Sequence, residues 1–414
     1  MMSKKSVLFI LGNYYPEPTG IGRFNNEMID WMADHSYECV VVTTYPYYPH
    51  WKVQKPYSRK KWWYAKEIKK TANNNSITIY RCPHFIPAEI TGKSRVISDF
   101  TFFVAVFFRL ILKLGQKFDY VMNVSPPLAP GLLAVWYKRL KKAKMIYHVQ
   151  DLQAEAAKEL HIVDSKKFID FILRLERHII EQADVVSSIS KGMALKVRQK
   201  TSKPVTLFPN WTDTNAFYPL PNRSSIKQEY GFSAADKIIL YSGAIGEKQG
   251  LDIILNVAEK FMGRPENKFI ICGTGPYKLK LELSAKAKNL SNVIFMPLQS
   301  EEKLNRFLNM ADVHLVVQKA GIADLMMPSK LANIMAVGGL PLVTVNGVSE
   351  LYLLLKNNCL AVLAKPENEK DILEKMEACL ALQYTHIGQN ARAYAEQFLS
   401  ADAVLPRYVN AVFN

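Results

Sequence analysis

The stretch from Gln318 to Ala336 gathers more potential chemistry than any other part of this 414-residue chain. It contains Pro328-Ser329-Lys330, with Asn333 about one turn further along. Pro328 cannot continue a helix from upstream and Ser329 is a good N-cap, so a helix is predicted to start here. The first N–H groups of that helix, its dipole and the Lys330 ammonium would converge on one anion. We therefore predict a phosphate site at this helix start.

Two glycine-containing loops each leave a predicted strand and open a predicted helix. One holds Gly246 and Lys248, and the other is Gly273-Thr274-Gly275-Pro276. A cation placed beside a departing diphosphate lowers the barrier to its release, so Lys248 could serve a leaving group. A lone loop lysine could equally be a solvated charge. The missing third glycine in the second loop argues against a dinucleotide-binding fingerprint.

A third glycine loop lies near the N-terminus. Gly20 and Gly22 follow the apolar run Val7–Leu11 and precede a predicted helix. Backbone N–H groups exposed at such a strand-to-helix loop suit a phosphate. A purely structural turn explains this loop equally well.

His148 and Asp151 come at and just after the end of the predicted strand Lys144–His148. Side chains of these types at the lip of a ligand site can orient sugar hydroxyls or relay a proton. The structural alternative is a packed His148 and a helix cap from Asp151. We expect at least one of the two to take part in function.

Several other chemistries have no sequence signature in the chain. There is no Asp-x-Asp triplet to hold a metal-bound nucleotide diphosphate, no G-x-x-x-x-G-K-[ST] loop and no G-x-S-x-G nucleophile. We expect no metal and no cofactor. Five scattered cysteines and an N-terminus without a long apolar region are typical of a cytoplasmic protein with reduced, mostly buried thiols.

Much of the formal net charge of +16 is concentrated between Trp51 and Lys70. Eight Lys and Arg residues alternate there with five Trp and Tyr residues, against a single acid. Basic side chains attract anionic headgroups, while Trp and Tyr favour the boundary between polar and apolar layers. We predict that this segment binds the inner leaflet of a membrane; a solvated loop is the alternative. The same composition could serve nucleic acid, which we do not expect.

The longest apolar stretch runs from Phe100 to Leu114 and is interrupted by Arg109 and Lys113. It falls short of the ~20 residues needed to span a bilayer. We predict a buried or partly interfacial helix rather than a segment that dips into the membrane.

The alternation of apolar runs with helical patterns predicts two α/β domains with parallel sheets. Periodicity is lost and prolines appear between Asn210 and Ser225, which we interpret as the linker. Two such sheets would place ligands in a deep cleft at the carboxyl ends of their strands. The predicted strands are Val7–Leu11, Glu38–Thr43, Ile77–Arg81, Tyr120–Val124, Lys144–His148, Val185–Ser188, Val205–Phe208, Lys237–Ser242, Lys268–Cys272, Val293–Met296, Val313–Val317 and Leu342–Val345.

Taken in order, these segments resemble the retaining family-4 glycosyltransferases, whose GT-B fold pairs two Rossmann-like domains. The likeness covers nearly the whole chain and is greatest to bacterial colanic-acid and O-antigen transferases of fucosyl or N-acetylfucosaminyl type. Each motif is modest in specificity, but their order and spacing together are specific. The segments are the Gly20–Gly22 loop, His148–Leu152, Ala183–Ser190, Pro209–Asp213, Gly246–Gly250, Gly273–Pro276 and Ala323–Leu331.

The resemblance implies roles for individual residues. Lys248 would grip the donor diphosphate, Lys330 would join it in stabilising the leaving group, and His148 or Asp151 would orient the substrates. The implied donor-binding set is Gly20, Gly22, Gly246, Gly273, Gly275, Pro297, Leu298, Gly321, Asp324, Leu325, Ser329 and Asn333.

The chain departs from the family pattern at two places. Asn333 stands where the second Glu of an E-x7-E pair usually holds the nucleotide ribose, and Asp324 is the nearest acid to the first. An Arg commonly found before the loop lysine is absent, with Ala244 near its place. Lys330 could compensate for the missing cation.

The resemblance implies a retaining transfer of a deoxy or N-acetylamino-deoxy hexose from a UDP- or GDP-linked donor. The implied acceptor is an undecaprenyl-diphosphate-linked sugar in bacterial surface-polysaccharide synthesis, at the cytoplasmic side of the inner membrane. The implied domains are residues 1–217 and 218–395, with a last helix in 396–414 packing back onto the first. The alternatives are a GT-B nucleotide-sugar epimerase and a non-catalytic protein that binds sugar or nucleic acid.

Overall fold

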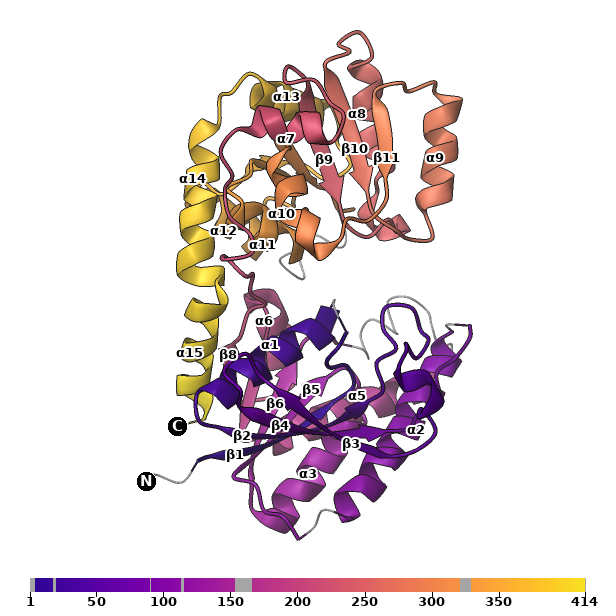
Figure 1. Cartoon of the computed structure of the whole chain (residues 1–414), viewed down its shortest axis with the longest axis vertical. Helices are drawn as coiled ribbons and strands as arrows, with labels where there is room; N and C mark the ends of the chain where they lie inside the picture. Colours follow the sequence, from indigo (N-terminus) through magenta and orange to yellow (C-terminus); the bar gives the residue numbers. More distant parts are fainter. Residues whose placement is uncertain are drawn as a thin grey trace. The chain divides into compact units, whose positions relative to one another are not determined.

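The computed structural model describes residues 4–17, 20–89, 91–112, 115–152, 166–320 and 329–413. The chain forms two compact units (Figure 1). The first comprises Met1–Phe208 together with Leu405–Asn414, and the second comprises Pro209–Val404. Each has its own sheet and its own buried core.

The first unit is built on an eight-stranded sheet in the order β3-β4-β2-β1-β5-β6-β7-β8. All neighbouring strands are parallel except β3, which pairs antiparallel with β4 at the edge. The central strands are almost wholly buried, as expected of a parallel sheet covered on both faces. The strands are β1 Ser6–Leu11, β2 Glu38–Thr44, β3 Ala65–Lys70, β4 Ser76–Cys82, β5 Tyr120–Ser125, β6 Lys144–Val149, β7 Val185–Ser188 and β8 Val205–Leu207.

Helices cover both faces of this sheet, with α2 and α3 on one side and α1 on the other (Figure 1). Thr91 caps α2 by accepting a hydrogen bond from the Ser94 N–H, so the helix starts earlier than predicted. The helices of this unit are α1 Gly20–Asp34, η1 Tyr57–Arg59, α2 Gly92–Ile111, α3 Pro130–Lys141, α5 Lys166–Gln182, α6 Lys191–Arg198 and the end of α15 Ala401–Val412.

The predicted apolar helix corresponds to α2, which is only half buried. Phe102, Val106 and Leu110 point into the core, whereas Phe100 and Phe108 are exposed. In the described part of the chain, no helix is long and apolar enough to cross a membrane. Lys113 and Leu114 lie outside the described residues.

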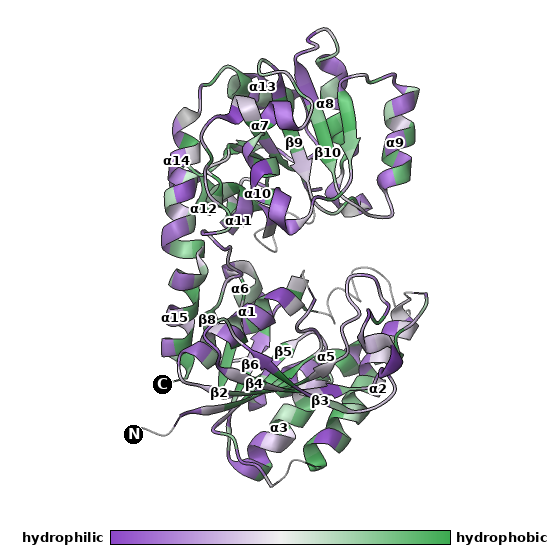
Figure 2. Cartoon of the chain, in the orientation of Figure 1, coloured by the Kyte–Doolittle hydropathy of each residue, from purple (hydrophilic) through white to green (hydrophobic). Residues whose placement is uncertain are grey.

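The second unit has a fully parallel six-stranded sheet in the order β11-β10-β9-β12-β13-β14. Its strands are β9 Lys237–Ser242, β10 Asn267–Cys272, β11 Val293–Met296, β12 Val313–Val316, β13 Pro341–Thr344 and β14 Val362–Ala364. Hydrophobic residues form the middle of β9 and most of β10, which is largely green in Figure 2. Its helices are α7 Arg223–Glu229, η2 Glu247–Gln249, α8 Asp252–Lys260, α9 Lys278–Ala287, α10 Glu301–Asn309, α11 Ser329–Ala336, α12 Glu350–Asn357, α13 Glu369–Leu380, α14 Thr385–Tyr394 and η3 Ala395–Leu399.

The segment interpreted as a linker is packed against the second unit instead. Trp211 and Phe217 are buried, and the Thr212 N–H donates to the Leu399 carbonyl oxygen at 2.8 Å. Burial of two aromatic rings offsets the conformational entropy that is lost when this segment, which has no helical or strand periodicity, becomes ordered. The chain passes between the units at Phe208–Pro209 and again at Val404–Leu405.

Candidate active site

The second sheet has a topological switch point between β9 and β12. From β9 the chain first adds β10 and β11 on one side, and then β12, β13 and β14 on the other. Loops at the carboxyl ends of two such neighbouring strands diverge and leave room for a ligand. The predicted lysine loop follows β9, and α11, which carries Lys330, follows β12. Both therefore belong to the same edge of the sheet.

Lys330 reaches from the first turn of α11 to the end of β9. Its Nζ lies 4.0 Å from the centroid of the Tyr241 ring. A Cβ added at Gly243 would come within 3.2 Å of the same nitrogen. Burial lowers the pKa of the Lys330 ammonium to about 7. A cation held in this way, with its charge facing a π surface, is ready to pair with an incoming anion.

The glycines of the Gly273–Pro276 loop allow two backbones to pass very close together. The Gly243 N–H donates to the Cys272 carbonyl at 3.0 Å, and the Ile245 N–H donates to the Thr274 carbonyl at 2.9 Å. A Cβ at Gly275 would lie 2.1 Å from the Ile245 carbonyl oxygen, and φ at Gly275 is +157°. These glycines thus position the loop after β9. Contact with the donor stays a prediction.

In the loop after β9, the Gln249 side chain folds back onto Gly246. Its Oε1 accepts the Gly246 N–H at 3.1 Å. The backbone of Lys248 lies in the short helix η2. Lys319, which the sequence analysis did not select, comes to this loop from the end of β12: a Cβ at Gly250 would be 3.0 Å from its Cγ. No pattern in the sequence around Lys319 predicts its contact with Gly250.

The remaining predicted donor residues are distributed around the same edge. Asn333 on α11 accepts a hydrogen bond from the Thr212 hydroxyl at 2.8 Å. Its side chain is therefore held by the segment after Pro209 with which the second unit begins. Pro297 and Leu298 follow β11 and are exposed. Ser329 begins α11. Gly321, Asp324 and Leu325 lie outside the described residues.

In the first unit, His148 lies within β6, which continues to Val149, one residue past the predicted end of the strand. Val149 pairs with Ser125 and Ser188, and this pairing carries the strand past the predicted end. The His148 ring is 1% exposed, and burial lowers the pKa of its imidazole to about 3. Asp151 follows β6 and is exposed. The buried position contradicts the expected open lip but leaves the role of His148 a prediction.

Gly20 and Gly22 belong to the first turn of α1. A Cβ at Gly22 would lie 2.7 Å from a carboxyl oxygen of Glu17. The other oxygen of Glu17 accepts the Tyr47 and Tyr48 N–H groups at 3.0 and 2.9 Å. Burial raises the pKa of this carboxyl. Gly22 therefore makes room for a buried acid that the sequence analysis overlooked.

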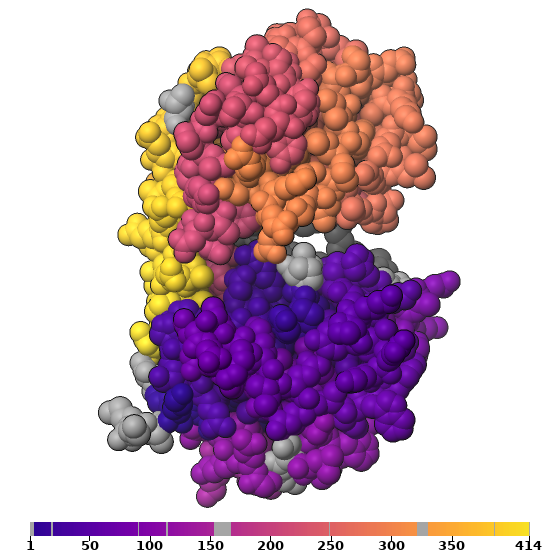
Figure 3. All heavy atoms as spheres, in the orientation of Figure 1, coloured from indigo at the N-terminus to yellow at the C-terminus, as the bar shows by residue number. Residues whose placement is uncertain are grey.

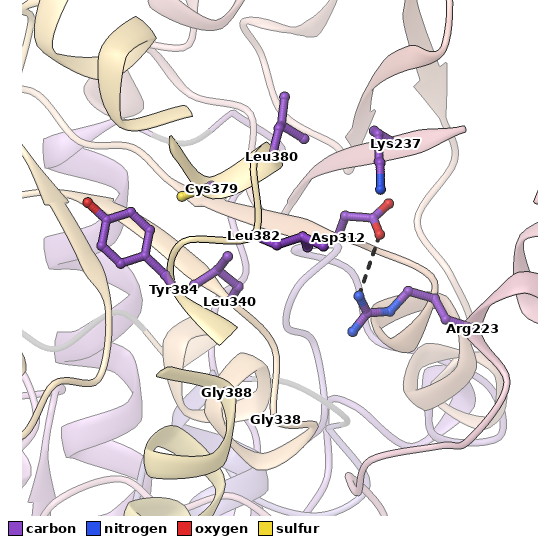
Figure 4. Close-up of a pocket in the computed structure, with 10 residues that line it drawn as sticks. All are labelled: Arg223, Lys237, Asp312, Gly338, Leu340, Cys379, Leu380, Leu382, Tyr384 and Gly388. Atoms are coloured by element: carbon purple, nitrogen blue, oxygen red, sulfur yellow. Dashed lines mark hydrogen bonds and ion pairs between the residues drawn. The ribbon is translucent and has the colours of Figure 1, made fainter. Parts of the chain in front are cut away.

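A pocket of about 230 Å³ in the second unit lies at the opposite edge of its sheet (Figure 4). It is lined by Lys237, which begins β9, and by Asp312, which precedes β12. Arg223 and Asp312 form an ion pair of 3.5 Å across it. Because the ligand edge of a parallel sheet is its carboxyl edge, this pocket is separate from the lysine site.

Comparison with known families decides the class of the protein. Residues 19–211 match the glycosyl transferase 4-like domain, and residues 222–394 match the glycosyl transferases group 1. The chain is 35% identical over 408 residues to the Escherichia coli (strain K12) glycosyl transferase WcaI, which is named for colanic acid biosynthesis. The match covers 96% of this chain and 97% of that protein. The protein is a group 1 glycosyltransferase.

Solved structures agree with this family in fold. Sucrose-phosphate synthase from Thermosynechococcus elongatus superimposes with a TM-score of 0.74 at 15% identity, covering 98% of both chains. HepE from Anabaena, in complex with UDP and glucose, gives a TM-score of 0.71 at 12% identity and covers 99% of both. WaaG, a glycosyltransferase of lipopolysaccharide biosynthesis, gives 0.68 at 15% and covers 98% of this chain and 99% of that one. The two parallel-sheet units therefore form a GT-B glycosyltransferase, as the sequence predicted.

Proposed function

We propose that this glycosyltransferase moves a sugar from a nucleotide diphosphate donor to a lipid-linked acceptor in bacterial surface-polysaccharide synthesis, with retention of anomeric configuration. The observation that carries the donor assignment is the half-buried Lys330 ammonium over Tyr241 at the switch point. The likeness to WcaI supports the pathway. A UDP- or GDP-linked deoxy or N-acetylamino-deoxy hexose is the proposed donor, without a metal.

In the proposed mechanism, departure of the nucleotide diphosphate builds negative charge beside α11. Lys330, Lys248 and the first N–H groups of α11 would stabilise that charge. The acceptor hydroxyl then attacks the anomeric carbon on the face that the diphosphate leaves, and its proton passes to the departing phosphate oxygen. His148 and Asp151 would orient the donor or acceptor from the first unit. The Nε2 atom of His148 is buried and has no hydrogen-bond partner among the described residues, so it keeps a free hydrogen-bonding position for a substrate hydroxyl that would reach it.

The transfer is tested by incubating the protein with a panel of nucleotide sugars and measuring nucleotide diphosphate release. Release that requires a lipid-linked sugar acceptor supports transfer, and NMR of the product gives its anomeric configuration. Release without an acceptor would favour a nucleotide-sugar epimerase of the same fold. Binding without release would favour a non-catalytic protein.

Affinity for the nucleotide diphosphate is expected to fall as pH rises above 7. Below pH 7 Lys330 is protonated and binds the anion directly, whereas above pH 7 binding must take up one proton. One linked proton corresponds to a loss of about tenfold per pH unit once pH is well above 7. Calorimetry at pH 7 to 9 in buffers of different ionisation enthalpy measures both quantities. Lys330→Gln should abolish the proton uptake; uptake that persists would assign it to another group.

A membrane-facing role for the first unit is supported by its exposed side chains. Trp62 and Trp63 are 63% and 75% exposed, and Lys52, Lys55, Lys60 and Lys66 are exposed near them in sequence. The N-terminal part of the chain, coloured indigo to violet, forms the face of the first unit drawn in Figure 3. The Tyr64 hydroxyl donates to the Ala105 carbonyl at 2.9 Å and ties this segment to α2.

The exposed stripe of α2 continues this apolar surface, and Figure 2 shows hydrophobic turns along the helix. Its members are Ile97, Phe100, Phe108 and Ile111, and the exposed Leu112 follows directly after the helix. Aromatic and aliphatic groups flanked by lysines are typical of proteins that lie on an anionic bilayer. We propose the cytoplasmic leaflet of the inner membrane as this surface's partner, where a lipid-linked acceptor would be met.

Changing Lys52, Lys55, Lys60 and Lys66 to Gln is expected to weaken binding to phosphatidylserine-containing vesicles by on the order of 10²–10³-fold, at about 1 kcal/mol per lysine. Lys69 is kept, because its Nζ pairs with Asp30 at 2.5 Å and lies over the Tyr15 ring. Vesicle co-sedimentation measures the change. The matched control carries the same charge change on the second unit, at Lys286, Lys303, Lys356 and Lys370, which are also exposed. Equal losses in both variants would contradict the assigned surface.

A further inference from the structure

Three neighbouring strands of the first sheet bring His148, Ser187 and Phe208 side by side. His148 on β6 is the register partner of Ser187 on β7. Phe208 follows β8, and its N–H donates to the Ser188 carbonyl at 2.8 Å. The C-terminal helix α15 covers them and contributes Tyr408, which lies 6.3 Å from His148 between ring centroids. Residues from four separate parts of the chain thus meet around one imidazole.

A chain of hydrogen bonds joins Tyr408 to His148. The His148 Nδ1 lies 3.0 Å from the Ser187 hydroxyl, and that hydroxyl lies 2.8 Å from the Tyr408 hydroxyl. All three side chains are at most 2% exposed. Because buried polar groups are costly to leave unpaired, these short contacts hold the imidazole in one orientation.

Only one of the two ring nitrogens of His148 has a hydrogen-bond partner among the described residues. Nδ1 is bound to Ser187, whereas Nε2 is buried without a partner among the described residues. A neutral imidazole has one donor and one acceptor nitrogen, and the partner of the first decides what the second can do. The Ser187 hydroxyl, itself bound to Tyr408, therefore decides whether Nε2 donates or accepts.

Aromatic packing also holds Tyr408 in place beside His148. The rings of Phe208 and Tyr408 are stacked, with centroids 3.6 Å apart and planes 4° from parallel. Phe208 is the last residue of the first unit before the chain leaves it, and Tyr408 comes four residues after Val404, the last residue of the second unit. The two places where the chain passes between units are therefore joined beside His148.

We propose that Ser187 and Tyr408 are positioning residues for His148, so that the C-terminal helix sets the orientation and tautomer of the imidazole that meets the substrates. This inference rests on the proposed function, because it requires His148 to contact a donor or acceptor. It assigns a role to Ser187, which lies in the Ala183–Ser190 segment without a role of its own, and it adds Tyr408, which lies in none of the sequence motifs.

Removing either hydroxyl tests the proposal. Tyr408→Phe keeps the ring that stacks on Phe208, and Ser187→Ala keeps the strand. Each is expected to lower kcat roughly tenfold to a hundredfold with little change in donor KM, because a mispositioned proton-transfer or orienting group loses part of its contribution. The double variant should be no worse than the worse single variant, since both break one chain. Ser187→Thr, which keeps the hydroxyl, should recover most of kcat.

Tyr120→Phe is the matched control. The Tyr120 hydroxyl donates to the Phe413 carbonyl at 2.8 Å and so anchors the same C-terminal segment without reaching His148. Both tyrosine variants should lower the melting temperature, but only Tyr408→Phe should lower kcat. If Tyr120→Phe lowers kcat as much, the effect comes from loosening the segment and the proposal is overturned.

Nitrogen-15 NMR of histidine-labelled protein gives a readout that a purely structural role would not move. The His148 signals are assigned by their loss in His148→Gln, and their shifts report the tautomer. A changed tautomer balance in Tyr408→Phe and Ser187→Ala is expected, and an unchanged one with full kcat overturns the proposal. If His148→Gln and His148→Ala themselves keep full kcat, it is the proposed role of His148 that fails.

Discussion

Replacing Lys330 with Ala is expected to lower kcat by about 10²–10³-fold while leaving the fold intact. The magnitude is that of removing one preorganised group that stabilises charge in a transition state. Lys330 lies at the switch point, over Tyr241 and against Gly243. Ala244 stands near the place of the family's usual Arg, so one cation that the family pattern supplies to the diphosphate is absent here. Single-turnover kinetics with a donor and a lipid-linked acceptor measure the loss.

Two further variants separate charge from packing at this position. Lys330→Met keeps the aliphatic stem and removes a half-buried cation, so it should be as inactive as Lys330→Ala and at least as stable as the original protein. Lys356→Ala removes another lysine that lies over an aromatic ring, 5.4 Å from the Tyr352 centroid on α12. It should keep full activity. Turnover near normal in Lys330→Met would remove Lys330 from the mechanism.

Changing Gly275 to Ala is expected to destabilise the second unit by roughly 3 kcal/mol or more, the range of strained or overpacked backbone positions. The added Cβ would meet the Ile245 carbonyl oxygen at 2.1 Å and its carbon at 2.6 Å. Both are backbone atoms that cannot rotate away. The loop after β9 would have to separate from the loop after β10, so donor binding should weaken as well. Urea unfolding and nucleotide titration measure the two effects.

Gly263→Ala is the control for that prediction. An added Cβ at Gly263 meets nothing within 4 Å. The substitution is therefore expected to change the free energy of unfolding by less than about 1 kcal/mol, in the range of ordinary surface substitutions. If Gly275→Ala proves equally mild, the two loops can separate freely and their contact does not position the site.

The sequence predicted the buried strands well because continuous apolar runs mark them. β7, β9 and β11 match their predicted bounds, and the other predicted strands differ by one residue at one or both ends. The exceptions are β3 and β14, which were not predicted. β3 reads Ala-Lys-Glu-Ile-Lys-Lys and has one large apolar side chain, so its hydrogen bonds to β4 define it rather than its hydrophobicity. β14 has only three residues.

The candidate site was predictable where chemistry is local to a motif and hidden where it depends on distant contacts. The start of α11 at Ser329 follows from Pro328 and Ser329 themselves. The contact of Lys330 with Tyr241, the bond from Thr212 to Asn333 and the link between Ser187 and Tyr408, 221 residues apart, arise from tertiary packing. The spacing of residues in the sequence does not predict which distant side chains come into contact. His148 was placed at an open lip for the same reason, since burial by α15 leaves no local signal.

The edge strand β3 also affects how the protein behaves in solution. An unpaired strand edge is a template for association with another chain, and lysines are a common means of preventing it. Lys66, Ile68 and Lys70 are the exposed residues of β3, and Ile68, which is 63% exposed, lies between the two lysines. The charges that would meet a lipid surface thus also keep this edge from self-pairing and aggregation. A preparation that carries Lys66→Gln should be checked by light scattering, because loss from solution could imitate sedimentation with vesicles.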